Sequence, residues 1–246
     1  MLSLFQSKPV LKDLIPENYI DIHSHLIPGI DDGARTFEDT LRLTQALQSF
    51  GMTQCITTPH IIEHVWDNTA EGIQEKKTAA VIELKKHHIT LPFRAAAEYM
   101  MDDHFVSLFK SEPLLTLKKN YVLVEMSYIN PPIQLYAILF ELQVAGYIPV
   151  LAHPERYLFY HHNEEEYNKL KTAGCLFQLN LLATVGYYGE AVTKVAEKLL
   201  QKGMYSFVGS DAHHDNHIAG FNQKIRIKDL TPLKEIIANN QFFSLE

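Results

Sequence analysis

The stretch Tyr19-Ile20-Asp21-Ile22-His23-Ser24-His25 joins an apolar, strand-like segment to two histidines separated by one residue. Side chains alternate between the two faces of a strand, so His23 and His25 are expected to point to the same side. Neutral imidazole is the commonest metal ligand in proteins, and two imidazoles on one side can bind one cation. The stretch therefore predicts a strand with a metal site at its carboxyl end.

Six further runs have strand-like patterns, and several are nearly continuous apolar segments, as parallel strands buried on both faces should be. Amphipathic helical patterns lie between them, the first of which opens with the capping-box pattern Thr36-Phe37-Glu38-Asp39. This linker-free alternation predicts an α/β chain with a (β/α) barrel of about seven strands, an open doubly wound sheet being the alternative. The predicted strands are 19–25, 53–58, 90–98, 121–125, 148–153, 175–180 and 205–211. The predicted helices are 36–50, 69–87, 102–110, 133–145, 164–173, 190–202 and 231–239.

A chain of 246 residues is long enough for one barrel of this kind, since such barrels routinely occupy about 250 residues. With 46% hydrophobic and 21% charged residues, the composition is that of a globular protein and excludes disorder and collagen-like repeats. The formal charge of −7 disfavours nucleic acid and anionic membranes as partners. The unusual count is 13 histidines, against 2 cysteines.

The sequence pattern favours a cytoplasmic protein. Residues 1–9 lack the charged and apolar segments of a secretory signal, and no window reaches the length of a membrane span, so no membrane insertion is expected. Cys55 and Cys175 lie in short apolar runs, where buried thiols that act as small hydrophobes are expected.

All seven predicted strands end in a histidine, a carboxylate or an amide. In a parallel barrel, functional side chains gather at the carboxyl ends of the strands, so we expect these residues on one rim. The candidate metal ligands are His23, His25, Asp32, His60, Glu98, Glu125, His153, Asp211 and His213. They exceed what one tetrahedral zinc needs, which favours two or three divalent ions with bridging carboxylates. Nitrogen and oxygen ligands without thiolates favour manganese, iron or zinc over a cysteine-based structural site.

Each piece of this rim has a plainer interpretation when it is taken alone. A single histidine such as His60 is often only hydrogen-bonded, and Glu98 or Glu125 could pair with a lysine or an arginine. The doublet Asp31-Asp32 before Gly33 would be a turn. The metal interpretation is favoured because all the pieces fall on one predicted rim.

Clusters of divalent ions are typical of enzymes that hydrolyse phosphate esters, because the ions bind phosphoryl oxygens and activate water. Arg156, three residues after His153, offers a planar guanidinium suited to a phosphate. The alternative for Arg156 is a surface ion pair with the adjacent Glu155.

Six motifs stand at or near the predicted strand ends: Asp21-Ile22-His23-Ser24-His25, Asp31-Asp32-Gly33, Thr58-Pro59-His60, Ala97-Glu98-Tyr99, Leu151-Ala152-His153-Pro154-Glu155-Arg156-Tyr157 and Gly209-Ser210-Asp211-Ala212-His213. Together they resemble the polymerase and histidinol phosphatase (PHP) superfamily. Their order and spacing are similar to its branch of bacterial protein tyrosine phosphatases linked to capsule and exopolysaccharide synthesis.

The resemblance implies a distorted (β/α)7 TIM-like barrel as a single domain over residues 19–246, with residues 1–18 as an N-terminal extension. It implies a metal-dependent protein tyrosine phosphatase with three divalent ions, usually manganese. The implied partner is a tyrosine-phosphorylated protein, namely the tyrosine-rich tail of a bacterial tyrosine kinase.

The resemblance also implies a role for each site residue. The attacking group would be a metal-bridging hydroxide, Arg156 would bind the substrate phosphate, and Asp211 and His213 would join Arg156 as catalytic residues. His23, His25 and Asp211 would hold one ion; Glu98 would bridge it to a second held by Glu125 and His153; and Asp32, His60 and His213 would hold the third.

One departure from the branch concerns a second arginine, which its members tend to carry shortly after the Asp-x-His motif. Here His214 and His217 follow instead, and the next arginine is Arg226. We expect His214 or His217 to take a substrate-binding role, with Arg226 reaching in from a shifted loop as the alternative. Six tyrosines near the rim could stack on a phenyl ring or simply pack the loops: Tyr99, Tyr128, Tyr157, Tyr160, Tyr187 and Tyr188.

Two other functions compete with the phosphotyrosine hypothesis. A small-molecule phosphatase, such as a histidinol-phosphate phosphatase, would share the metals but not the substrate. A non-catalytic metal-binding domain would bind a partner without turnover. A nuclease role is disfavoured by the acidic balance and the lack of Lys/Arg clusters.

Overall fold

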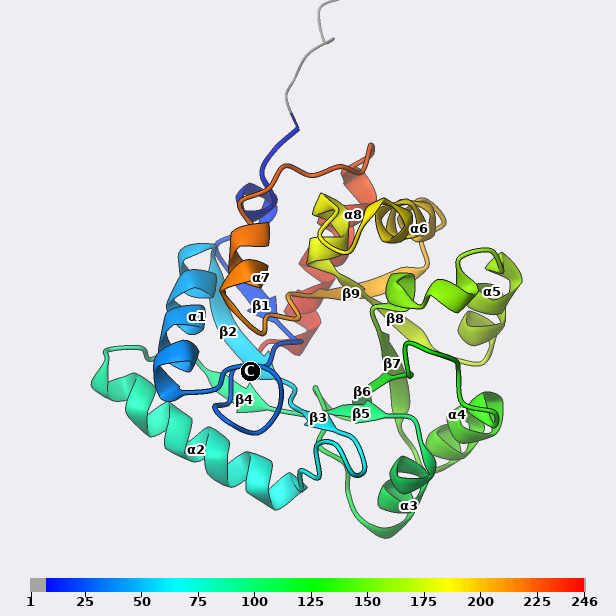
Figure 1. Cartoon of the computed structure of the whole chain (residues 1–246), viewed down its shortest axis with the longest axis horizontal. Helices are drawn as coiled ribbons and strands as arrows, with labels where there is room; N and C mark the ends of the chain where they lie inside the picture. Colours follow the sequence, from blue (N-terminus) through cyan, green and yellow to red (C-terminus); the bar gives the residue numbers. More distant parts are fainter. Residues whose placement is uncertain (1–7, 246) are drawn as a thin grey trace, which may run out of the picture.

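Parallel strands form a ring with helices around it, as Figure 1 shows for the computed structural model, which describes residues 8–245. The strands form two parallel sheets, of order β1-β2-β4 and β3-β5-β6-β7-β8-β9. Their bounds are β1 Tyr19–Asp21, β2 Met52–Thr57, β3 His60–Ile61, β4 Phe93–Ala95, β5 Glu98–Met100, β6 Tyr121–Glu125, β7 Ile148–Ala152, β8 Leu176–Asn180 and β9 Tyr205–Gly209. The α-helices are α1 Phe37–Ser49, α2 Ala70–Lys86, α3 Asp103–Ser111, α4 Leu135–Val144, α5 Glu164–Thr172, α6 Glu190–Gln201, α7 Asp215–Gly220 and α8 Thr231–Asn239.

The barrel wall is interrupted between β2 and β3 and again between β4 and β5, which accounts for the division into two sheets. Pro59 separates β2 from β3, because proline has no backbone N–H to continue a ladder. Across the gap, the Ala96 N–H donates to the Thr57 carbonyl (2.9 Å) and the Glu98 N–H donates to the Pro59 carbonyl (3.0 Å). The predicted strand 90–98 is therefore wrong as a single strand: it is two short strands, and Glu98 opens the second.

Residues 21–25 and 209–212 close the ring between β1 and β9. The Asp211 N–H donates to the His23 carbonyl (2.7 Å), and the His25 N–H donates to the Ala212 carbonyl (2.9 Å). The Asp21 carboxylate accepts hydrogen bonds from the Ser210 backbone N–H and hydroxyl. The structure thus confirms the distorted (β/α)7 barrel: β1 ends at Asp21, and its continuation pairs irregularly with the segment after β9.

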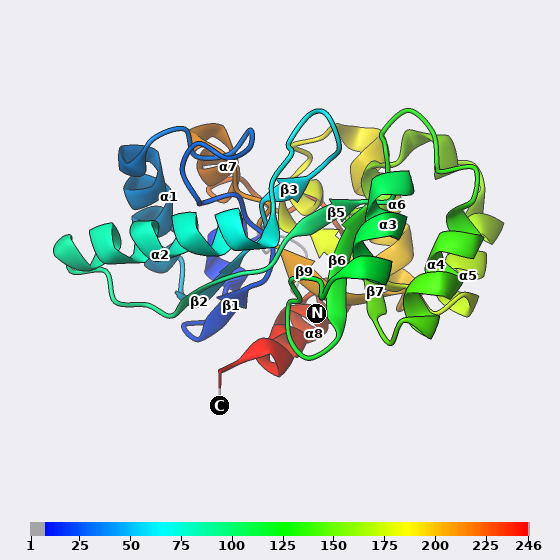
Figure 2. The same ribbon diagram turned by 90° about the horizontal axis from the view of Figure 1, so that it is seen from below.

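The interior of the barrel is a packed apolar core. Its buried residues are Ile20, Ile22, Ile56, Ala96, Leu117, Leu123, Val150, Ala152, Phe207 and Phe243. Phe243 belongs to η5 (Asn240–Phe243), the 3₁₀ helix that follows α8. The Asn240 amide donates to the Ile20 and Val208 carbonyls (both 2.9 Å), so this segment joins β1 to β9. Figure 2 shows α8 at the opposite end of the barrel from β3.

The helices follow the sequence signals closely. The Thr36 hydroxyl accepts from the Asp39 N–H while the Asp39 carboxylate accepts from the Thr36 N–H, so the predicted capping box forms at the start of α1. Helix α7 was not predicted, because its short segment carries no apolar periodicity.

Within residues 8–245, every helix is too short or too polar to cross a membrane. Cys55 and Cys175 are buried, as predicted.

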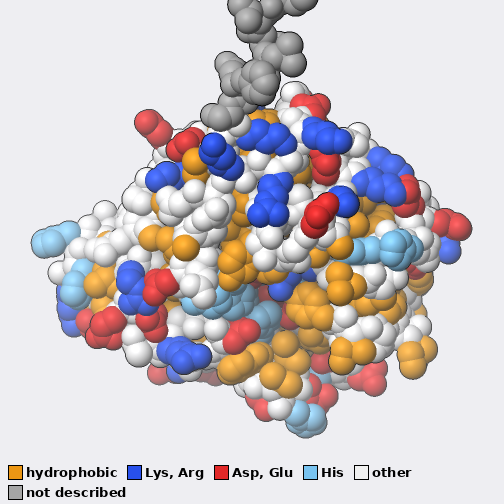
Figure 3. Space-filling model, turned by 45° about the horizontal axis from the view of Figure 1, so that its top comes forward, with side chains coloured by type: hydrophobic (Ala, Val, Ile, Leu, Met, Phe, Trp, Pro, Cys, Tyr) orange, Lys and Arg blue, Asp and Glu red, His pale blue; other side chains and the backbone are white. Residues whose placement is uncertain are grey.

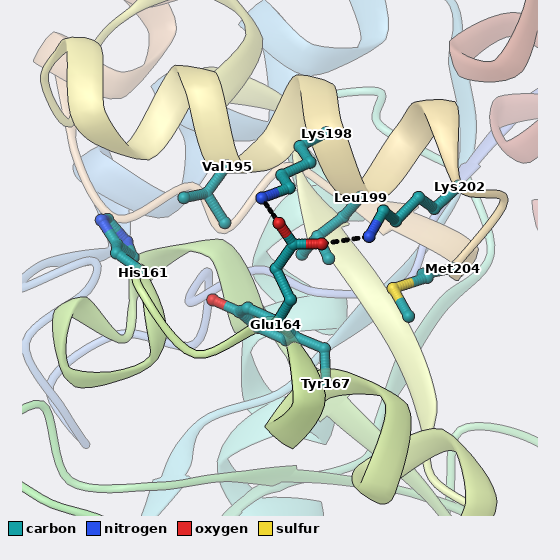
Figure 4. A pocket seen from close by; sticks show the side chains of 8 residues that line it. All are labelled: His161, Glu164, Tyr167, Val195, Lys198, Leu199, Lys202 and Met204. Atoms are coloured by element: carbon teal, nitrogen blue, oxygen red, sulfur yellow. Dashed lines mark hydrogen bonds and ion pairs between the residues drawn. The ribbon is translucent and has the colours of Figure 1, made fainter.

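A crevice between α5 and α6 is closed by ion pairs. Glu164 contacts both Lys198 and Lys202, and all three side chains face one another in Figure 4. The cavity beneath them has a volume of only about 10 Å³, which is room for about one water molecule. This crevice ties two helices together and leaves no space for a ligand.

The closure of the barrel floor predicts a large loss of stability for Phe243→Ala. This ring is fully buried against Phe207, whereas its neighbour Phe242 is 37% exposed. Truncation of a buried phenylalanine costs about 3 to 5 kcal/mol, so urea unfolding should show a loss of that size for Phe243→Ala and a clearly smaller one for the control Phe242→Ala. Equal losses in the two variants would contradict the proposed role of Phe243.

Candidate metal centre

The structure brings all nine predicted ligands to the carboxyl ends of the strands. Three groups have ligand atoms within 4.8 Å of one another: His25, Asp32, His60 and His213; His23, His25, Glu98 and Asp211; and His60, Glu98 and Glu125. His153 stands beside these groups, with its Nε2 3.2 Å from the Glu98 Oε1. His60 belongs to two of the groups: it lies with Asp32 and His213, as the resemblance implies, and also with Glu98 and Glu125.

The second of these groups joins two histidines to two carboxylates. Nε2 of His23 lies 3.1 Å from Glu98 Oε2 and 3.2 Å from Asp211 Oδ1. Nε2 of His25 lies 3.4 Å from each of the same two oxygens. All four side chains are buried. Two nitrogens and two carboxylate oxygens at these separations form a cage for one cation.

These side chains surround an open cavity of about 250 Å³. Its lining residues are Asp32, His60, Glu98, Tyr128, His153, Arg156, Asp211, His213, His214 and His217. Figure 3 shows histidine side chains in a hollow of the surface. The Asp32 side chain is 57% exposed, so it lies at the mouth, whereas Glu98 lies at the floor.

Buried partners fix the orientation of His23 and His25. The Nδ1 of His23 is 2.8 Å from Gln178 Oε1, and the Nδ1 of His25 is 2.8 Å from Asp31 Oδ2. Each contact leaves Nε2 directed at the carboxylates, which is the usual arrangement of metal-binding histidines. Sequence reasoning missed both partners. The Asp31-Asp32 doublet was a usable signal, and a glutamine in the apolar strand β8 was a weaker one.

Two strand ends turn sharply toward the centre. His153, after β7, has φ 36°, and Asp211, after β9, has φ 50°. Such left-handed conformations cost non-glycine residues on the order of 1 kcal/mol and are concentrated at functional sites. Here they follow the strands directly, at two residues whose buried side chains contact Glu98 and His23.

The electrostatics of the floor favour added positive charge. Burial alone would lower the pKa of His23, but the carboxylates of Glu98 and Asp211 outweigh this effect and raise it to about 10. For Asp211, the nearby His23 and His213 overcome the effect of burial and lower its pKa well below the usual range. A divalent cation meets the same need for positive charge.

A second observation supports the fit of a metal ion. His60 Nδ1 and Glu125 Oε1 lie 2.8 Å apart and are buried, yet their orientation makes no hydrogen bond, and neither atom has a hydrogen-bond partner within residues 8–245. Two electron-rich atoms that converge in this way suit a shared cation. The His, Asp and Glu clusters are therefore suited to metal binding.

Arg156 lies at the edge of the centre. Its guanidinium lies between the rings of Tyr128 (4.8 Å) and Tyr188 (4.2 Å), and its Nη1 donates to Asp211 Oδ2 (2.8 Å). The alternative pairing with Glu155 is wrong, because the Glu155 carboxylate is buried and accepts from the Asn180 N–H and the Tyr205 hydroxyl.

His214 and His217 both line the cavity, whereas Arg226 does not. Nδ1 of His217 accepts a hydrogen bond from the His213 N–H (3.1 Å), and burial lowers the pKa of His217 to about 3. Its imidazole is therefore neutral and supports the His213 backbone. The Arg226 guanidinium lies against Gly186 instead.

The rim tyrosines divide between the two sequence-based interpretations. Tyr128 lines the cavity and Tyr188 stacks on Arg156. Tyr99 and Tyr157 are buried, and their hydroxyls accept backbone hydrogen bonds from Leu115 and Met126. These two tyrosines pack the loops rather than face a ligand.

A parallel barrel with clusters of histidines and carboxylates at its mouth defines a metal-dependent hydrolase of the barrel type. A family model described as capsular polysaccharide synthesis, CpsB/CapC, matches residues 19–224. The chain belongs to this CpsB/CapC family, and the resemblance inferred from the motifs is confirmed.

Named relatives and solved structures agree with this assignment. The tyrosine-protein phosphatase YwqE of Bacillus subtilis is 29% identical over 196 residues, 79% of this chain and 77% of that protein. The tyrosine-protein phosphatase CpsB of Streptococcus pneumoniae is 28% identical over 203 residues, 79% of this chain and 83% of that protein.

Among solved structures, one from work on YwqE of B. subtilis and CpsB of S. pneumoniae, described as metal-dependent tyrosine phosphatases, matches with a TM-score of 0.77 and 27% identity. It covers 88% of this chain and 86% of that chain. An amidohydrolase from Mycoplasma synoviae, at 12% identity and a TM-score of 0.52, covers 96% of this chain and 90% of that chain and shares the fold alone.

The contact between Asp31 and His25 predicts weaker metal binding in Asp31→Asn. The substitution keeps an acceptor for His25 but removes the charge, and loss of such a partner typically lowers metal affinity about 10- to 100-fold. Titration calorimetry of chelator-treated protein with Mn²⁺ measures the change. Asp13→Asn, at an exposed position outside the three ligand groups, is the matched control, and an affinity of Asp31→Asn equal to that of the control would contradict the role of Asp31.

Proposed function

We propose that this chain is a metal-dependent protein tyrosine phosphatase that acts in capsule or exopolysaccharide synthesis. The observation that carries the proposal is the convergence of nine nitrogen and oxygen ligands beside Arg156 in a member of the CpsB/CapC family. Relatives named as tyrosine-protein phosphatases support the reaction and the substrate class.

In this proposal the centre holds three divalent ions, manganese first, with iron or zinc as alternatives. One ion would be held by His23, His25, Asp211 and Glu98, a second by Glu98, Glu125 and His153, and the third by Asp32, His60 and His213. Ions bound there would supply Lewis acidity and lower the pKa of water for attack on phosphorus. Three groups of converging ligand atoms support the number of ions.

The protein's own residues bind and orient the phosphate. Arg156 has five N–H donors, and the contact with Asp211 takes up one nitrogen. The remaining donors are available to phosphate oxygens in the cavity, and the Tyr128 and Tyr188 rings hold the guanidinium plane. His214, on the cavity wall, is available to a second phosphate oxygen. It would take the role of the second arginine that other members of the branch tend to carry after the Asp-x-His motif. The neutral His217 positions His213.

The proposed partner is a tyrosine-phosphorylated protein, namely the tyrosine-rich tail of a bacterial tyrosine kinase, and the proposed location is the cytoplasm. The net charge of −7 argues against nucleic acid. The cavity is nevertheless suited to an anion, because bound divalent ions and Arg156 would offset its carboxylates.

Arg156→Ala tests the phosphate contact. Charge-assisted hydrogen bonds are worth about 1.5 to 3 kcal/mol, so kcat/KM on a phosphotyrosine peptide with Mn²⁺ should fall by about 10- to 100-fold, while metal content measured by mass spectrometry stays near that of the wild type.

Complete removal of metal should abolish hydrolysis in the wild type. Activity that survives such removal would refute the metal-dependent reaction.

Histidinol phosphate separates the two phosphatase hypotheses. We expect kcat/KM for a phosphotyrosine peptide to exceed that for histidinol phosphate in the same Mn²⁺-loaded preparation. The reverse order would assign the site to a small phosphorylated metabolite. Turnover of neither substrate would favour the non-catalytic domain.

A thiol mechanism is tested by Cys175→Ser. Burial raises the pKa of the Cys175 thiol to about 12, so a thiolate nucleophile is disfavoured at neutral pH. The variant should keep wild-type kcat, measured on p-nitrophenyl phosphate. A loss of most of the activity in a folded Cys175→Ser protein would overturn this expectation.

A further inference from the structure

A second groove opens beside the metal-binding cavity. Its lining residues are Tyr128, Arg156, Leu158, Tyr188 and Val192, and its volume is about 200 Å³. Tyr128 and Arg156 line the cavity as well, so the groove lies directly beside the cavity. Figure 3 shows hydrophobic side chains gathered beside the histidine-lined hollow.

The groove combines a buried apolar side chain, Val192 at 4% exposed, with apolar side chains that the fold leaves exposed. Leu158 is 62% exposed, although the adjacent Tyr157 and nearby Tyr160 are buried. Tyr128 is 46% exposed, and the next residue, Ile129, is 85% exposed. Single exposed apolar residues are ordinary, but a contiguous group at the edge of a ligand cavity marks a binding surface.

A different part of the cavity rim has a different character. Another groove there shares Asp32, His213 and His214 with the cavity and also carries Arg35 and Arg42. Arg42 is held by Asp39 and Asp215. The two grooves that adjoin the cavity therefore differ: one carries arginines and carboxylates, and the other carries Leu158 and Val192 beside Arg156.

We propose that the groove of Leu158 and Val192 is a docking site for an apolar or aromatic side chain of the substrate polypeptide, next to the phosphotyrosine. The inference rests on the proposed function and adds a sequence preference to it. The phosphate end of the substrate binds among charged groups, which favour any phosphate ester. Discrimination among phosphotyrosine sites therefore depends on contacts beyond the cavity, and this groove adjoins the cavity at Arg156.

The occupant is a substrate chain because the groove shares residues with the phosphate site. A free phosphate carries no apolar group for Leu158 to contact. A polypeptide presents a neighbouring side chain within a few ångströms, because its residues advance about 3.3 Å each when extended.

Leu158→Ser tests the docking site with two phosphotyrosine peptides that differ only in the flanking residue, leucine or serine. The Mn²⁺-loaded wild type should prefer the leucine peptide by about tenfold in kcat/KM, mainly through KM, since a side chain in an apolar pocket typically gives tenfold or more discrimination. Leu158→Ser should lose this preference and keep wild-type kcat on p-nitrophenyl phosphate. Ile82→Ser, at a 53% exposed position on α2, is the matched control.

A binding measurement separates failure of the docking site from failure of the proposed function. Fluorescence anisotropy with peptides that carry a non-hydrolysable phosphonate analogue of phosphotyrosine reports the preference without turnover. Binding preference without hydrolysis of any phosphotyrosine substrate would support the groove and refute the proposed reaction. Hydrolysis without preference, or a preference kept in Leu158→Ser, would overturn the docking site. A changed oligomeric state of Leu158→Ser in sedimentation would assign the groove to a second copy and also overturn it.

Discussion

The closure of the barrel between residues 21–25 and 209–212 is the constraint on which the rest of the structure depends. Backbone hydrogen bonds from Asp211 to His23 and from His25 to Ala212 align two ligand-bearing segments side by side. The same hydrogen bonds that complete the ring thus place His23, His25 and Asp211 in one cluster. The fold and the site depend on each other, because the residues that close the barrel also provide candidate ligands of the metal centre.

Much of this arrangement could be predicted from sequence, because its signals are local. Strand β6 was predicted with the bounds that the structure shows, since its apolar run is continuous and both ends are polar. The ligand-bearing strand ends were found because a histidine or carboxylate at the end of an apolar run is costly without a partner. Helix α8 also has its predicted bounds.

The remaining features depend on tertiary contacts that no local pattern encodes. The break between β4 and β5 arises where the partner strand is interrupted at Pro59. Gln178 supports His23 from a strand that is distant in the sequence, and a glutamine in an apolar strand is only a weak signal that does not name its partner. The placement of Arg156 between Tyr128 and Tyr188 likewise required the fold; spacing had left Glu155 as an equal alternative.

The same closure has a kinetic consequence. Asp21 and Ser210, which bond across the seam, are 189 residues apart in the sequence. Chains dominated by such distant pairings fold slowly, because loop-closure entropy is lost before the contact is gained. Until the seam forms, the edges of β1 and β9 stay open to pairing with other chains. The histidines and carboxylates of the centre therefore come together late in folding. Conditions that stabilise this cluster should also reduce pairing of the open β1 and β9 edges with other chains.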